Sequence, residues 1–413
     1  MAKAIDNLRL KSQSTTYAPS IRALGTLRLT IGLSIVFSAL ISLAGISWDI
    51  QWHTFVGRDR TLIPPHIMML TGIALGGLLS LAAVCLETAW VRRKPQLTQY
   101  STQFAGMFYG SLGAYIAGFA ALDAGIAFPL DSYWHSLYGI DVSLWAPFHV
   151  MIGSGMAIMA LGAAAMLYSA RNLMQSEQRR RAAKLSAIAM LIALSLTFSF
   201  FTMFLSTALN TGNLIPLGIT GLTSYPLLAG FLTAFIFATA RTSGGKRFNA
   251  TLVILFYIVF ALIFSTFVPP ATNLLVTQEQ LQYRRALDAY AYLSIVAVSM
   301  WGLLPILIAP VYDLVARQLQ MSSWSEQRRT WTYAILASLA GIPVFILNPT
   351  AILKLISHIG SSGLCLSLLI GVLASYAGTL LGQRTGEILC LGENESIVEL
   401  RTDEMLRQGN DAE

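Results

Sequence analysis

Charged residues are scarce in this sequence: Asp, Glu, Lys and Arg make up 11% of its 413 residues, against about 25% in water-soluble domains. Hydrophobic residues make up 55%, and the mean hydropathy is +0.62. A water-soluble core of this size cannot bury so much apolar surface while exposing so few charges. Disordered chains are excluded for the opposite reason, because they are poor in hydrophobic residues. The remaining class is a multi-span membrane protein.

Cysteine is also rare. The three cysteines, Cys85, Cys365 and Cys390, fall in the inner halves of expected helices or in the C-terminal tail. None has the spacing of a zinc finger, so neither a disulfide framework nor a metal finger is expected. The sequence also has no glycine-rich phosphate loop, no nucleophile elbow and no haem-type cysteine pair.

Long apolar runs predict an all-α, polytopic bundle of about ten helices in the lipid bilayer, since a span takes roughly 20 mostly apolar residues. The expected spans are 27–47, 64–86, 103–126, 146–170, 184–207, 216–240, 250–270, 288–312, 331–348 and 360–382. The expected domains are a cytoplasmic segment at 1–26, a four-span domain at 27–183, a six-span domain of unknown role at 184–384 and a cytoplasmic tail at 385–413.

The distribution of Lys and Arg predicts the orientation. With the N-terminus inside, 22 of the 27 basic residues fall in inner segments. The outer segments hold Arg58, Arg60, Arg284, Arg285 and Lys354. Cytoplasmic loops of membrane proteins carry such an excess, so both termini are expected inside. The net charge of +7 therefore indicates cytoplasmic loops rather than a nucleic-acid partner.

Four of the five histidines lie in two similar segments. The ligand-type residues of these segments are Asp49, His53 and His66 in the first, and Asp131, His135 and His149 in the second. In both segments, an Asp stands four residues before the first His, and a Trp directly precedes that His. A Gly follows this His after four residues and an Asp after six, and a Pro stands two residues before the second His. The two histidines are 13 residues apart in one copy and 14 in the other. The pattern indicates an internal duplication of a helix hairpin.

The spacing predicts that each hairpin gathers three ligand side chains at the outer membrane face. Residues four apart share a helix face, so Asp49 can meet His53 and Asp131 can meet His135. The second His opens the next helix just after a Pro that suits a first turn. One carboxylate and two imidazoles suit copper, zinc or non-haem iron, with coordination positions left open.

Interpretations of these residues other than metal binding also stay open. An interfacial His or Asp can be a hydrogen-bonded anchor, and the neighbouring Trp residues can belong to an interface belt. In that case the chain is a scaffold that binds no metal. Arg58, Asp59 and Asp141 either support the ligands, as a carboxylate does when it orients a histidine, or are solvated loop charges. The fifth histidine, His358, stands alone and is expected to be an interface residue.

These residues resemble the C subunit of the copper membrane monooxygenases, the particulate methane and ammonia monooxygenases. The first segment is similar to that subunit's Asp-x3-His-x12-His copper site, with Trp before the His, Arg-Asp after it and Pro before the last His. The second is similar to the neighbouring Asn-x3-His-x13-His site, which ends in Ala-Pro-x-His. This chain has Asp131 where the family has Asn. The resemblance covers about residues 30–170.

The resemblance implies bound copper, O2-dependent oxidation of a small hydrocarbon or ammonia, and partner subunits of the A and B types in a bacterial plasma membrane. It gives the ligand roles to Asp49, His53 and His66, and places Asp131, His135 and His149 at the second site. Three functions therefore compete: a metal-dependent monooxygenase component, a transporter or insertion factor for a transition metal, and the metal-free scaffold. A homo-oligomer is left open.

Overall fold

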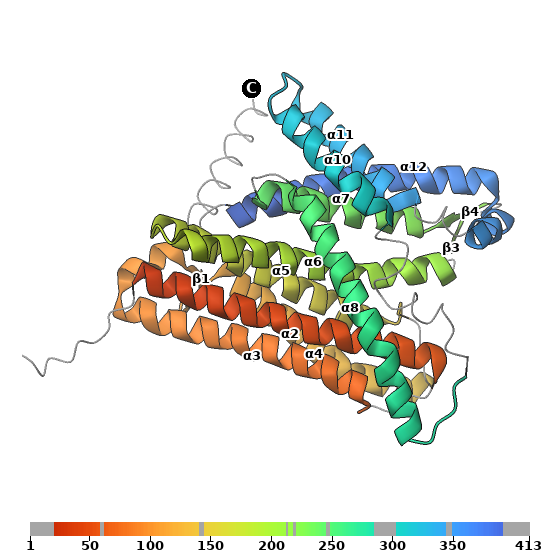
Figure 1. Ribbon diagram of the computed structural model, residues 1–413, viewed down its shortest axis with the longest axis horizontal. Helices are drawn as coiled ribbons and strands as arrows, with labels where there is room; N and C mark the ends of the chain where they lie inside the picture. The colour runs from red at the N-terminus through yellow and green to blue at the C-terminus, as the bar shows by residue number, and fades with distance from the viewer. Residues whose placement is uncertain are drawn as a thin grey trace, which may run out of the picture.

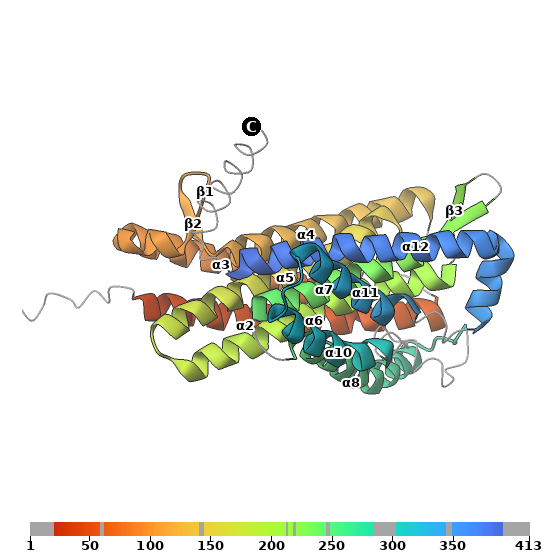
Figure 2. The same ribbon diagram turned by 90° about the horizontal axis from the view of Figure 1, so that it is seen from above.

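The structure is a computed structural model that describes residues 20–57, 62–139, 144–211, 214–217, 220–244, 248–284, 303–343 and 349–390. Within these ranges it is an α-helical bundle with two small β-hairpins (Figures 1 and 2). The helices of the first part are α2 (Ile21–Phe55), α3 (Pro64–Arg93), α4 (Leu112–Tyr138), α5 (Pro147–Ser176) and α6 (Arg180–Thr211). Those of the second part are α7 (Tyr225–Gly244), α8 (Asn249–Gln278), α10 (Leu303–Gln320), α11 (Glu326–Gly341) and α12 (Pro349–Cys390).

Eight helices in the described residues are long and apolar enough to cross a membrane: α2 to α8, and α12 from Ile356 to Leu389. The multi-pass membrane character predicted from the composition is therefore supported. Two of the ten expected spans, 288–312 and 331–348, have no counterpart among the eight. Helix α10 has 18 residues and α11 has 16, fewer than the ~20 of a typical span. Residues 285–302 and 344–348 lie outside the described part.

Two β-hairpins occupy positions where the hydropathy predicted helix. The expected span 103–126 starts too early, because β1 (Thr102–Phe104) and β2 (Phe108–Gly110) pair antiparallel before α4 begins. Gly106, with φ +71°, makes the turn between them, a conformation that glycine adopts without strain. Likewise β3 (Leu214–Leu217) and β4 (Thr220–Thr223) precede α7, so the expected span 216–240 begins later than predicted.

Helices α2 to α5 lie side by side along the longest axis of the molecule, and α8 crosses them obliquely (Figure 1). Small residues allow the close approach, as is usual between membrane helices. Gly113 and Gly162 face the backbones of α5 and α4, and Gly72 faces α2. The main hydrophobic cluster includes side chains from both parts of the chain, from Leu29 to Leu389.

A buried ion pair ties the beginning of α2 to the end of α3. Arg28 and Glu87 are almost fully buried, and two nitrogens of Arg28 donate to the two carboxylate oxygens of Glu87 over 2.9 and 2.7 Å. Arg28 also donates to the Tyr100 carbonyl over 2.6 Å and to the Ser169 hydroxyl over 2.5 Å. The pair therefore joins α2, α3, α5 and the segment before β1, at the end of the bundle opposite to the histidines.

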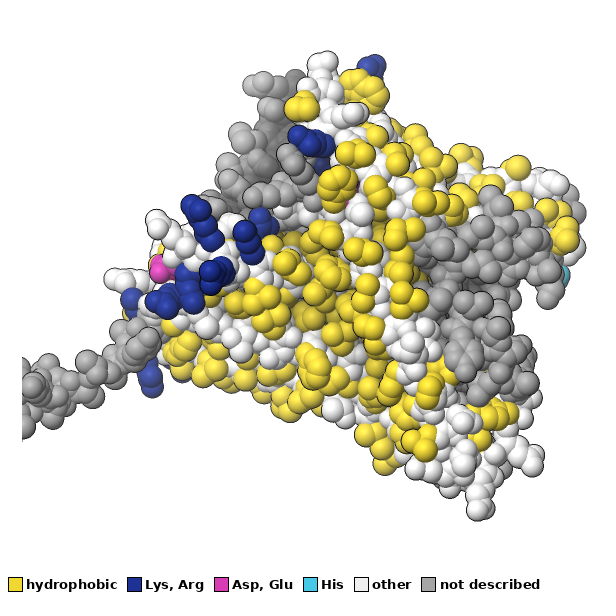
Figure 3. Space-filling view, in the orientation of Figure 1, with side chains coloured by type: hydrophobic (Ala, Val, Ile, Leu, Met, Phe, Trp, Pro, Cys, Tyr) yellow, Lys and Arg dark blue, Asp and Glu magenta, His cyan; other side chains and the backbone are white. Residues whose placement is uncertain are grey.

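Basic side chains gather at this same end of the bundle (Figure 3). They come from the beginnings of α2 and α6 and the ends of α3 and α5: Arg22, Arg92, Arg93, Arg171, Arg179, Arg180 and Arg181. The separation between this basic end and the histidine end agrees with the positive-inside pattern. The orientation in a membrane stays a prediction.

Candidate metal centres

The first site is built by the end of α2 and the beginning of α3. Asp49 and His53 share one face of the last turns of α2, and His66 lies in the first turn of α3. Asp49 Oδ1 lies 3.4 Å from His53 Nε2 and 3.0 Å from His66 Nε2. The three side chains, separated by one loop in the sequence, therefore converge on a single carboxylate oxygen, as the spacing predicts.

The second site repeats this arrangement on α4 and α5. Asp131 Oδ2 lies 3.3 Å from His135 Nε2 and 3.2 Å from His149 Nε2. Again one carboxylate oxygen lies between two Nε2 atoms, with the Asp and first His on the outgoing helix and the second His on the returning one. The duplication seen in the sequence is thus a duplication of side-chain geometry.

A glycine at the end of one helix and a proline at the start of the next shape both hairpins. A glycine four residues after the first histidine takes a positive φ, +72° at Gly57 and +84° at Gly139, and so ends the helix as only glycine does freely. Pro64 and Pro147 begin the returning helices, where the missing N–H of proline costs nothing. These residues explain why the Gly and Pro positions recur in the motif.

Both groups of side chains fit a transition-metal ion. In each group the three ligand atoms lie within 4.8 Å of one another. Bonds of ~2.0–2.2 Å from a metal to N and O ligands place those ligands about 3–4 Å apart, close to the separations found here. The six side chains are 13–21% exposed, so both groups are partly accessible rather than fully enclosed in the core.

A backbone carbonyl orients His135 at the second site. Its Nδ1 lies 3.1 Å from the carbonyl oxygen of Gly139, which can only accept a hydrogen bond. With Nδ1 as the donor, Nε2 points toward the Asp131 carboxylate, 3.3 Å away. A backbone carbonyl on the far nitrogen is also the usual partner of a metal-ligating histidine.

Aromatic and polar contacts fix the site helices against their neighbours. The His66 ring meets Phe128 of α4 edge-on, with centroids 5.5 Å apart, so a ligand-type side chain of the first group touches a helix of the second. Gln51 accepts a hydrogen bond from Thr272 of α8 over 2.5 Å, and Trp48 packs against Phe267 of the same helix. The second hairpin instead packs against α6, through Trp145 and Phe204.

The sequence identified all six ligand-type side chains but not these contacts. The Gly139 carbonyl is part of the recurring glycine position, so the motif contained a signal for it. Phe128 and Thr272 have no such signal, because helix packing alone brings them to the site. The predicted supporting residues Arg58, Asp59 and Asp141 lie outside the described residues. His358 lies on α12, exposed and away from both groups.

No protein-family model, curated protein or solved structure matches this chain.

Proposed function

We propose that this chain is a membrane protein that binds two copper ions, one in each hairpin, and acts as the metal-binding component of an O2-dependent oxidase or monooxygenase. The observation that supports the metal sites is the repeated convergence of one carboxylate oxygen and two Nε2 atoms. Copper, rather than zinc or iron, follows from the resemblance to the copper membrane monooxygenases, and all three metals accept this ligand set.

The oxidase proposal rests on the few ligands at each site. Two imidazoles and one carboxylate leave coordination positions for O2 or substrate, and bound copper supplies the redox chemistry. The chain would contribute the rest: the Gly139 carbonyl, 3.1 Å from His135 Nδ1, would accept a hydrogen bond from that nitrogen and leave Nε2 to hold a bound ion. The Asp131 carboxylate balances part of the positive charge of the ion. The small substrate is a hydrocarbon or ammonia by the same resemblance, and the electron donor is a partner subunit.

The second candidate function is handling of the metal itself, as a transporter or insertion factor. Sites that are open toward one end of the bundle favour uptake of an ion. A transport path needs further ligands across the membrane, however. Within the described part of the chain, these two are the only groups of three His, Cys, Asp or Glu residues close enough to share an ion. This observation favours the oxidase.

Elemental analysis and O2 consumption test the proposal together. The purified protein should hold two copper ions per chain, with an electron paramagnetic resonance signal of nitrogen-ligated Cu(II). O2 consumption in vesicles should rise when a small alkane or ammonia is added in the presence of an electron donor. Ion accumulation inside vesicles without O2 consumption would favour the transporter, and the absence of bound metal would leave the scaffold.

A further inference from the structure

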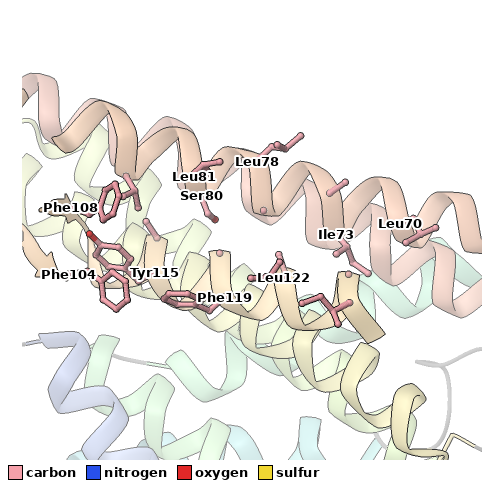
Figure 4. Close-up of a pocket in the computed structure, with 18 residues that line it drawn as sticks. Leu70, Ile73, Leu78, Ser80, Leu81, Phe104, Phe108, Tyr115, Phe119 and Leu122 are labelled. Carbon is pink, nitrogen blue, oxygen red and sulfur yellow. The ribbon is translucent and has the colours of Figure 1, made fainter. Parts of the chain in front are cut away.

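A long apolar groove lies between α3 and α4 (Figure 4). Its volume is about 780 Å³, within the ~300–1,000 Å³ typical of ligand-binding pockets. The lining includes small residues such as Ala74, Gly77 and Gly125. It also includes Leu78, Leu81 and Leu122, which are all more than half exposed.

The chemistry of the lining excludes a polar ligand. Of its eighteen residues, only Ser80 and Tyr115 carry a polar side-chain atom. The Ser80 hydroxyl already donates to the Gly76 carbonyl of its own helix over 2.8 Å. Tyr115 adds one hydroxyl beside Phe104, and no lining residue carries a charge, so the occupant must be hydrocarbon along most of the groove.

The ends of the groove give it a direction. The lining runs from Leu70 to Val84 on α3, which is ~21 Å at 1.5 Å per residue. At the basic end the β1–β2 hairpin closes it, where the Phe104 ring packs on Tyr115 and Phe119 with centroids 5.5 and 5.6 Å apart. At the other end Leu70 lies one helical turn beyond His66.

The place of the groove favours a lipid chain as its occupant. Both groove helices are candidate membrane spans, so the exposed leucines of the lining face the hydrocarbon of the bilayer. A lipid chain lies along such a surface, parallel to the helices, and enters from the side.

We propose that this groove is a binding site for one acyl chain of a bilayer lipid, seated lengthwise between α3 and α4 with its path ending next to His66. The site stands on the groove alone. Its consequence for chemistry rests on the proposed function: apolar, unbranched molecules dissolved in the bilayer would reach the first metal site through this groove, without passing through water.

Photolabelling tests the acyl-chain site. The protein is placed in phosphatidylcholine vesicles in which a small share of the lipid carries a diazirine at the end of one acyl chain. After illumination, peptide mapping compares the label on α4 with the label on the exposed face of α8, around Leu262 and Ile263, which reports ordinary surrounding lipid. We expect the ratio of label on α4 to label on α8 to be about tenfold higher in the wild type than in a filled variant.

The filled variant is Ala74→Phe combined with Gly125→Leu. Ala74 is exposed, and a side chain at Gly125 meets Ile73 at an ordinary 4.0 Å, so both additions enter the groove rather than the core. Ala74→Phe alone is the second variant if the pair does not fold. Ala82→Phe adds the same ring on α3 at an exposed position outside the lining and should leave the ratio unchanged.

The outcomes separate this site from the metal proposal. An equal ratio in the wild type and the filled variant overturns the acyl-chain site. A ratio that falls in the filled variant supports it, and two retained metal ions per chain show that the metal sites stay intact. If the wild type binds no metal and its labelling still depends on Ala74, the proposed function fails and the acyl-chain site stands.

Discussion

The ring of His66 packs edge-on against the ring of Phe128, with centroids 5.5 Å apart. His66 is a ligand-type residue of the first hairpin, and Phe128 stands one helical turn before Asp131 of the second. The first candidate metal centre therefore packs against the helix that carries Asp131 and His135 of the second.

Phe128→Leu should weaken metal binding at the first centre. An edge-to-face aromatic pair contributes ~0.5–1.5 kcal/mol, so removal of the ring should lower the affinity by about threefold to tenfold. The second centre should keep its affinity. Titration against a competing chelator measures both values, with Phe119→Leu, farther along α4, as the control. An equal loss at the two centres would show that the substitution disturbs α4 as a whole.

Single histidine substitutions should remove the metal ions one at a time. His53→Ala and His135→Ala should each leave one ion per chain, and the double variant none, because each removes one of only three ligands. His358→Ala is the matched control, since that histidine lies exposed on α12 outside both groups. Elemental analysis after gel filtration gives the stoichiometry. Two ions retained in His53→Ala and in His135→Ala would contradict the assignment.

Asp131→Asn should weaken the second centre without changing its shape. The substitution keeps the carbonyl-type oxygen but removes the negative charge beside the ion, which lowers the affinity for Cu(II) at least about tenfold. Asp49→Asn should do the same at the first centre. Chelator competition measures both. An unchanged affinity in Asp131→Asn would mean that this carboxylate is not a ligand.

Gly139→Ala should destabilise the second hairpin. The backbone at Gly139 has φ +84° and ψ 178°, a conformation that costs other residues ~1–3 kcal/mol. The substitution should also move the carbonyl that fixes His135 and so reduce metal affinity at this centre. Denaturation in mixed micelles, with and without metal, measures both effects. Gly125→Ala on the same helix, where a methyl group has room, should cost little.

Breaking the buried ion pair should destabilise the fold more than any of these changes. Arg28→Met leaves the Glu87 carboxylate buried without its charge partner, which costs ~3–5 kcal/mol. The double variant Arg28→Met with Glu87→Leu should recover a large part of that loss, because no lone charge remains. Unfolding in mixed micelles tests this. Additive losses in the double variant would show that the two residues act separately.

The ligand geometry could be predicted because it depends on short-range rules. The four-residue spacing of Asp49 and His53 sets their shared helix face, and the glycine and proline positions set the turn and the next helix. The two copies of the motif therefore predicted six side chains, three in each hairpin, and the convergence of each three depends on a single hairpin. Only the helix pairing, which follows from the short loop, had to be assumed.

The rest depends on long-range packing or on averages that hide local structure. The hydropathy of 103–126 is dominated by the apolar residues from Leu112 onward, so the hairpin around Gly106 left no trace in the average. The contact of Phe128 with His66 depends on where α3 packs against α4. No residue pattern in either helix predicts that position. The count of ten spans stays a prediction, because most of the expected span 288–312 lies outside the described residues and α10 and α11 have only 18 and 16 residues there.

The two hairpins carry the same ligand-type side chains but pack against different helices. Gln51 and Trp48 of the first are held by α8, and the backbone N–H of Arg284, just beyond α8, donates to the Phe55 carbonyl over 2.7 Å. Trp145 of the second rests on α6. Because the two hairpins contact different helices, a substitution in α8 can alter the surroundings of the first candidate centre while the contacts of the second with α6 stay unchanged.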